Sequence, residues 1–174
     1  FILLINWILL TFIANSLFRN NYHTLKIPDN LIYNSVLKIQ PENSIIDKNF
    51  QYTMSIKIEP GGEDINAIST NLNYDPQMVN VLDIIKTDSI CRQDLFLEQL
   101  IDNQKGQVRI SCVLPDFNLL IKEGKIADLV IQAQQTGPFV IEFDPSSQVL
   151  ANDGLGTNVL RTHINASYQT QDLT

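Results

Sequence analysis

Two patterns of apolar and polar residues divide the chain. Residues 1–18, FILLINWILLTFIANSLF, are mostly apolar and contain no charge. From about residue 35 onward, the pattern changes to short stretches in which apolar and polar residues alternate. An apolar run of this length predicts a helix of roughly 27 Å, close to the thickness of a bilayer core. Alternation with a period of two predicts strands that each have one buried face.

The clearest strand is predicted at residues 50–58, FQYTMSIKI, in which every second residue is apolar. Residues 95–101 are predicted as a short helix or a loop. The other predicted strands are residues 68–74, 78–85, 107–114, 127–133, 139–143, 149–151 and 159–164. This pattern, with Gly, Pro, Asn and Asp in the turns, predicts a mainly β fold: an eight- or nine-stranded jelly-roll β-sandwich behind one N-terminal hydrophobic helix.

The predicted organisation has four parts. Residues 1–18 form the hydrophobic helix, 19–34 a connector, 35–165 the sandwich and 166–174 a C-terminal tail. The chain has 174 residues, and its net charge is −7, with a pI near 4.6. Single, scattered Lys and Arg residues and an acidic balance argue against a nucleic-acid partner.

The two cysteines, Cys91 and Cys112, are too far apart for a zinc or thioredoxin motif. Behind an export-type leader, a disulfide between them is predicted, and two buried free thiols are the alternative. Asn165 begins the triplet Asn-Ala-Ser, which fits an N-glycosylation site if the organism glycosylates its surface proteins.

Three interpretations of residues 1–18 are open: a secretory signal peptide, a membrane anchor and an assembly helix. The run lacks the basic start that is typical of a signal peptide. It resembles the start of mature type IV pilins, which begin with Phe, continue into an apolar helix and carry a β-rich head. Many bacterial pilins have Glu at the fifth position, where this chain has Ile5. The predicted assembly residues are Phe1, Leu4, Ile5, Trp7, Ile8, Phe12 and Leu17.

The rest of the chain resembles a cohesin-type domain, a nine-stranded sandwich related in shape to some carbohydrate-binding modules. The segments that carry this resemblance are INAI (65–68), LNYDP (72–76), VNV (79–81), GQVRIS (106–111), GKIADL (124–129) and VLANDGLGTNVL (149–160). The last segment is similar to the final hairpin of cohesin-like domains in surface proteins of small-genome bacteria. The resemblance implies a sandwich over about residues 35–162, and it implies no catalytic residues.

No motif for catalysis or metal binding is found. His23 and His163 have no partner at a metal-ligand spacing, and no G-x-S-x-G nucleophile elbow is present. Residues 152–156, NDGLG, are interpreted as a hairpin turn and not as a calcium loop, because the regular ligand spacing is missing.

A flat row of exposed aromatic residues, as sugar binding would require, is also not found. Phe50, Tyr52, Tyr74, Phe139 and Phe143 are predicted in the core. Three aromatic residues remain as surface candidates: Phe96, Phe117 and Tyr168.

The sequence therefore predicts a non-enzymatic extracellular surface protein without a cofactor or metal. In the leading hypothesis, copies assemble through the N-terminal helix into a pilus-like filament that displays the cohesin-like head, and the helix is membrane-inserted at least transiently. In the alternative, a membrane-anchored monomer acts as an adhesin or scaffold module. Its sandwich then binds a protein or a glycan, and protein recognition needs only strand surface and paired polar groups.

Overall fold

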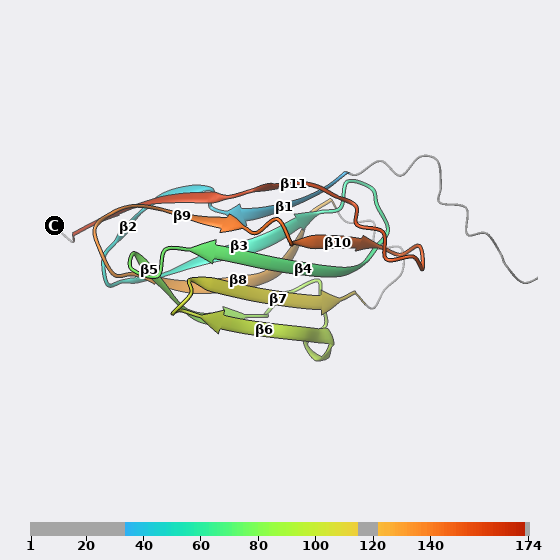
Figure 1. The fold of residues 1–174 in the computed structure, drawn as a ribbon, viewed down its shortest axis with the longest axis horizontal. Coiled ribbons are helices and arrows are strands. Elements are labelled where there is room, and N and C mark those ends of the chain that lie inside the picture. Colours follow the sequence, from blue (N-terminus) through green and yellow to red (C-terminus); the bar gives the residue numbers. More distant parts are fainter. Residues whose placement is uncertain (1–33, 115–121, 173–174) are drawn as a thin grey trace, which may run out of the picture. The chain divides into compact units, whose positions relative to one another are not determined.

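A computed structural model describes residues 34–114 and 122–172, which form a sandwich of two β-sheets (Figure 1). Residues 1–33, which include the predicted hydrophobic helix and most of the connector, lie outside the described residues. Within the described ranges, no helix has the length and apolar character needed to span a bilayer.

The first sheet has five strands in the order β11-β1-β3-β8-β5. Strand β1 pairs in parallel with β11, and the other neighbours are antiparallel. The strands of this sheet are β1 (Ser35–Gln40), β3 (Gln51–Glu59), β5 (Val79–Ile85), β8 (Gly124–Ala133) and β11 (Leu160–Ile164). The long strands β3 and β8 therefore lie at its centre.

The second sheet has seven strands, with the order β2-β12-β9-β4-β7-β6 and with β10 paired to β4. Strands β10 and β9 follow one another along β4, because β10 pairs with its first half and β9 with its end. The strands of this sheet are β2 (Asn43–Asp47), β4 (Ile65–Tyr74), β6 (Phe96–Asp102), β7 (Gln107–Val113), β9 (Gly137–Phe143), β10 (Gln148–Ala151) and β12 (Ala166–Gln171).

The core consists of the inward-facing apolar residues of both sheets. Successive strand residues point to opposite faces, so alternate positions are buried while their neighbours are partly exposed. The largest fully buried side chains are Leu37, Ile39, Met54, Ile56, Ile58, Ile68, Leu72, Ile110, Ile126, Leu129, Ile131 and Tyr168. Full burial of such a side chain stabilises the fold by roughly 1.5–3 kcal/mol relative to its exposure.

The structure corrects several predictions from the sequence. The described residues contain twelve strands instead of eight or nine. Residues 166–171, predicted to belong to a tail, form β12 between β2 and β9. Tyr168 on this strand is 1% exposed and stacks on Phe139, so it is a core residue and not a surface aromatic. Phe50, predicted as a core residue at the start of the alternating stretch, is 55% exposed because it lies in the turn before β3.

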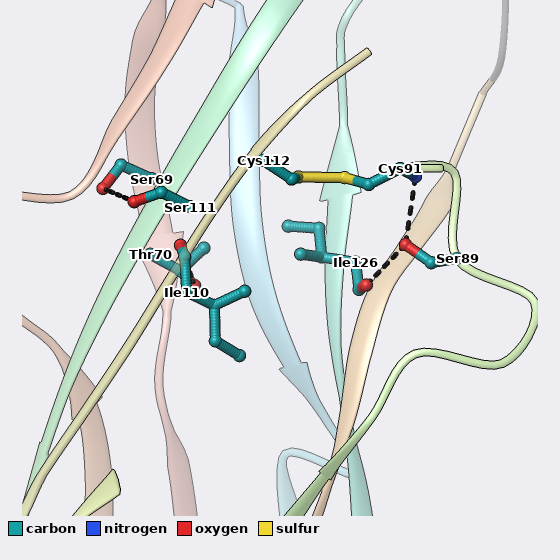
Figure 2. Close-up of a disulfide and its surroundings, with 8 residues drawn as sticks. All are labelled: Ser69, Thr70, Ser89, Cys91, Ile110, Ser111, Cys112 and Ile126. Carbon is teal, nitrogen blue, oxygen red and sulfur yellow. Dashed lines mark hydrogen bonds between the residues drawn. A yellow bond between two sulfur atoms is a disulfide. The ribbon is translucent and has the colours of Figure 1, made fainter. Parts of the chain in front are cut away.

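The connection from β5 to β6 links the two sheets, and a disulfide fixes it in place. Cys91, in this connection, is bonded to Cys112 on β7, and both residues are buried (Figure 2). The Ser89 hydroxyl donates a hydrogen bond to the Ile126 carbonyl of β8 at 2.6 Å and accepts one from the Cys91 N–H at 3.0 Å. The connection, which contains the single 3₁₀ turn η1 (Gln93–Leu95) of the described residues, is therefore held to both sheets.

A second link between the sheets is the Asn103 side chain, in the turn between β6 and β7. Its Oδ1 accepts hydrogen bonds from the Val81 N–H of β5 at 2.9 Å and from the Tyr74 hydroxyl of β4 at 2.7 Å, and its Nδ2 donates to the Val81 carbonyl. The amide thus satisfies both backbone groups of Val81 on the edge strand β5. The same turn contains Gly106 at φ +66°, where a Cβ atom would lie 2.0 Å from the Tyr74 carbonyl oxygen.

We expect removal of the disulfide to lower the free energy of unfolding by about 3 kcal/mol, because the bond closes a loop between residues 21 apart in sequence. Chemical denaturation of the Cys91→Ala/Cys112→Ala variant measures this change. Addition of a reductant to the native protein is expected to produce the same shift and to leave the double variant unaffected. Equal midpoints for the oxidised protein and the variant would contradict the expectation.

We expect Asn103→Ala to lower the free energy of unfolding by about 2–3 kcal/mol, because it leaves the Val81 N–H and C=O and the Tyr74 hydroxyl without their partner. Thermal unfolding followed by circular dichroism measures the effect. Gln104→Ala, at the exposed neighbouring position, is the matched control and should leave the midpoint nearly unchanged. A loss below about 0.5 kcal/mol for Asn103→Ala would show that the amide does not hold β5 in place.

Candidate binding surfaces

The site residues predicted from the sequence fall in different places. The predicted assembly residues of the N-terminal helix, Phe1 to Leu17, lie outside the described residues, so assembly through them stays a prediction. The Cys91–Cys112 pair is bonded, as the extracellular interpretation predicts. Asn165 is exposed between β11 and β12, and its Oδ1 accepts a hydrogen bond from the Phe143 N–H at 3.0 Å. Its glycosylation stays a prediction.

The outer surface of the five-stranded sheet over β3, β8 and β5 is the first candidate surface, and we call it the β3–β8–β5 face. It carries the residues that alternate with the buried ones on these strands. The face consists of Gln51, Thr53, Ser55, Asn80, Leu82, Asp83, Ile85, Lys125, Asp128, Val130 and Gln132.

The centre of the β3–β8–β5 face is partly apolar. Val130 of β8 lies opposite Thr53 of β3 on one side and Asp83 of β5 on the other. A β-bulge in β5 between Val81 and Asp83 brings Leu82 to the surface, where it is 42% exposed. Val130 is half-buried at the middle strand and Leu82 is exposed on the edge strand β5, so the face has an apolar patch of the kind that suits contact with another protein.

Polar side chains beside this centre are held in fixed positions. Asp128 of β8 accepts a hydrogen bond from the Ser55 hydroxyl at 2.5 Å and forms an ion pair with Lys125 at 2.9 Å. Farther along the sheet, the Lys38 ammonium contacts both Glu59 and Glu123, and Lys57 contacts Glu123 at 2.7 Å.

Lys38 is only 7% exposed, so its charge depends on these partners. The hydrogen bonds that Lys38 donates to Glu123 and Glu59 raise the pKa of Lys38, and the hydrogen bonds that Glu123 accepts from Lys38 and Lys57 lower the pKa of Glu123. Lys38 and Glu123 are therefore both charged at neutral pH.

The second candidate surface is a polar cleft of about 270 Å³ on the outer surface of the seven-stranded sheet. Its floor is formed by paired segments of β4 and β7, in which Asn71 faces Arg109 and Asn73 faces Gln107. One wall is the β9–β10 loop with Asp144 and Ser146. The cleft exists because the partner of β4 changes from β10 to β9 here, and the loop between them leaves the ladder.

The side chains of the polar cleft form a continuous hydrogen-bond chain. Asn73 Nδ2 donates to Asp144 Oδ2 at 2.9 Å, and Asn71 Nδ2 donates to Ser146 Oγ at 2.8 Å. The Ser146 hydroxyl in turn donates to Asp144 Oδ1 at 2.6 Å. Gln107 Nε2 extends the chain by donating to Asn73 Oδ1 at 3.4 Å. The donors around Asp144, with the Ser146 hydroxyl first, lower the pKa of its carboxyl to about 2.

The described residues offer no catalytic or metal-binding arrangement. No group of three or more His, Cys, Asp or Glu side chains among them could hold a metal ion. In residues 152–156, the Asp153 carboxylate accepts hydrogen bonds from the Leu155 N–H and the Thr157 hydroxyl, so its oxygens close the turn. His163 packs on the Phe143 ring, and His23 lies outside the described residues.

Sequence reasoning missed both candidate surfaces. The alternation at residues 50–58 and 127–133 identified two of the strands, but it could not show that they are neighbours in one sheet. The only local signal for the cleft wall was the Asp-Pro-Ser-Ser turn at residues 144–147. Nothing in the sequence paired this turn with Asn71 and Asn73, since more than 70 residues separate them.

Comparison with known proteins identifies the fold. No family model and no curated protein matches the sequence. Solved structures of cohesins do match. The solution structure of CaCohA2 from Clostridium acetobutylicum has a TM-score of 0.66 at 13% identity, covering 79% of this chain and 90% of that one. The seventh ScaB type I cohesin from Pseudobacteroides cellulosolvens has a TM-score of 0.65 at 12% identity, covering 80% and 94%.

A third match is the Coh-OlpC–Doc435 complex from Clostridium thermocellum, a type I cohesin–dockerin complex. It has a TM-score of 0.63 at 15% identity, covering 80% of this chain and 93% of the matched chain. The described sandwich therefore has the cohesin fold, and the resemblance found in the sequence is confirmed at the level of the fold. At this identity, the likeness does not extend to a partner.

We expect the carboxyl of Asp144 to titrate at about pH 2 in the folded protein. Because its pKa is lowered on folding, its ionised form stabilises the fold above the ordinary carboxyl pKa, and this contribution is lost as the pH falls toward 2. Carbon-13 NMR of the side-chain carboxyl measures the midpoint. Ser146→Ala removes the main donor and should raise the midpoint toward 4, whereas Ser167→Ala on β12 should not. A midpoint near 4 in the native protein would contradict the cleft geometry.

Proposed function

We propose that the chain is a non-enzymatic, extracellular module that binds a protein partner through the β3–β8–β5 face. The observation that carries this proposal is the combination of the cohesin fold with a sheet surface that has an apolar patch, half-buried Val130 and exposed Leu82, and fixed polar neighbours. The buried disulfide supports an oxidising location outside the cell.

The matched structures supply the class of partner. The Coh-OlpC–Doc435 structure is a cohesin bound to a dockerin, and the CaDoc0917–CaCohA2 structure is another such pair. Both are complexes between two protein modules. A protein partner is therefore the simplest ligand for a sandwich of this fold, and a dockerin-like module is the first candidate to test.

The size of the five-stranded sheet fits such a partner. Strand β8 has ten residues, and the sheet has five strands. At about 3.3 Å per residue and 4.8 Å between strands, the five strands cover roughly 600 Å², somewhat less than the 800 Å² that each partner buries in a standard interface. Regular strands also hold their side chains in place before binding, so little conformational entropy is lost on association.

The make-up of the β3–β8–β5 face matches the anatomy of protein interfaces. Val130 on the middle strand and Leu82 on the edge strand β5 offer apolar contact, and amide and hydroxyl side chains such as Gln132 and Thr53 lie beside Val130. The Ser55–Asp128–Lys125 network keeps a charged group from being buried without a partner when the face is covered. The polar cleft on the opposite sheet has no comparable apolar centre, because its lining is mostly amide, carboxylate and guanidinium groups.

We expect Val130→Arg to weaken binding of the protein partner by at least tenfold, because a large charged side chain would then occupy the centre of the interface. The full chain, immobilised as bait, captures partners from the secreted protein fraction of the source cells, and mass spectrometry identifies them. Isothermal titration calorimetry with the purified partner then compares the native chain and the variant.

Gln169→Arg is the matched control, since Gln169 is exposed on the outer surface of the seven-stranded sheet. It introduces the same charge and should leave the affinity unchanged. The proposal is wrong if the native chain captures no protein, or if the partner binds the native chain and the Val130→Arg variant equally well.

A further inference from the structure

We propose that the polar cleft between β4, β7 and the β9–β10 loop binds a neutral sugar, as a second site on the sheet opposite the β3–β8–β5 face. This inference goes beyond the proposed function, because it uses other residues, another sheet and another class of ligand. The cleft is lined by Asn71, Asn73, Gln107, Arg109, Asp144 and Ser146. The Leu72 and Val108 side chains are buried in the core, so these residues contribute their backbone to the floor.

The charge of the cleft favours a neutral ligand. Arg109 and Asp144 are the two charged residues of its lining, and their charges cancel. Arg109 is exposed and only 3.6 Å from Glu98, while Asp144 stays ionised because Asn73 and Ser146 donate to it. An anionic or cationic ligand would be repelled by a charge of its own sign at one side of the cleft. A ligand that carries many hydroxyl groups and no charge meets none.

The hydrogen-bond chain of the cleft presents both donors and acceptors to a ligand. Each of Asn71, Asn73 and Gln107 uses one N–H of its amide within the chain, so a second N–H remains. The carbonyl oxygens of Asn71 and Gln107 accept no hydrogen bond from another described residue. Neighbouring sugar hydroxyls each donate and accept, and they match such a mixed set of fixed amide groups.

The arrangement of strands argues against a peptide in the same cleft. Peptides that bind sheets usually add a strand at a free edge. Here β4 is paired on both sides, by β7 and by β9 and β10, and β7 lies between β4 and β6. Their backbone groups are therefore already used, in the ladder or, for Asn71, in hydrogen bonds with Asp144 and Ser147 of the β9–β10 loop. The cleft also lacks an apolar pocket for a peptide side chain, since its exposed lining is mainly polar.

Without an aromatic ring in its lining, the cleft should bind sugars weakly, in the millimolar range. The test is an NMR titration of the nitrogen-15-labelled full chain, kept in a detergent whose headgroup is not a sugar. The probes are glucose, galactose, N-acetylglucosamine and the disaccharides cellobiose, lactose and chitobiose. We expect at least one probe to shift the side-chain amide signals of Asn73 and Gln107 in a saturable manner.

Two substitutions place the binding in the cleft. Gln107→Ala and Arg109→Ala each remove a lining group that points out of the sheet, and each should weaken binding at least tenfold with an unchanged thermal midpoint. Gln132→Ala, a matched outward amide on β8, should bind the sugar like the native chain. The Val130→Arg variant should also keep sugar binding, so failure of the protein-binding proposal and failure of this one are distinguishable.

The proposal is overturned by any of three results. In the first result, none of the six sugars shifts the amide signals of the cleft. In the second, the shifted signals lie outside the cleft and the shifts survive both substitutions. In the third result, a capped glycine–serine tetrapeptide shifts the amide signals of the cleft more strongly than every sugar does, and the cleft is then a peptide site.

Discussion

The burial of one face of each sheet against the other is the constraint on which the rest of the structure depends. Side chains alternate between the two faces of a strand, so each apolar residue that joins the core leaves its neighbours pointing outward. On β8, Leu129 and Ile131 are fully buried, and Val130 between them is directed to the surface. The residues available for binding are therefore fixed by the same pattern that builds the core.

Two links beside the core, the disulfide and the Asn103 amide, hold the two sheets together along the side of the sandwich formed by β5 and β6. The disulfide joins the β5–β6 connection to β7, and the Asn103 amide joins the β6–β7 turn to β5. The Asn103 amide acts beside the bulge that exposes Leu82, whereas the disulfide lies at the other end of the β6–β7 hairpin, where Cys112 is opposite Phe96. The position of Leu82 on the β3–β8–β5 face thus depends on contacts made by the opposite sheet.

The two outer surfaces differ in chemistry because the strands of the two sheets are paired in different ways. Continuous pairing of β3, β8 and β5, interrupted only by local register shifts, produces an extended surface that is suited to a broad protein contact. On the other sheet, the strand that pairs with β4 changes from β10 to β9, and this change leaves a cleft lined mainly by amide side chains and one carboxylate. A module with one surface for a protein and one for a sugar could connect a glycan-coated surface to a protein partner.

The sequence predicted the parts of the fold that depend on local patterns. Strict alternation identified β3 and the strands that build the centre of both sheets, and the export-type leader favoured a disulfide over two free thiols. Strand β12 was missed because its inward residues, Ala166, Tyr168 and Thr170, do not form an apolar run. The two surfaces could not be predicted, because each is assembled from strands that are distant in sequence and paired only in the fold.

A structure of the full chain bound to its purified protein partner tests the central claim most directly. The account predicts that the partner covers the five-stranded sheet and removes Val130 and Leu82 from solvent, with the polar cleft left open on the opposite side. A partner seated on the seven-stranded sheet, or added as a strand along the free edge of β6, would contradict it.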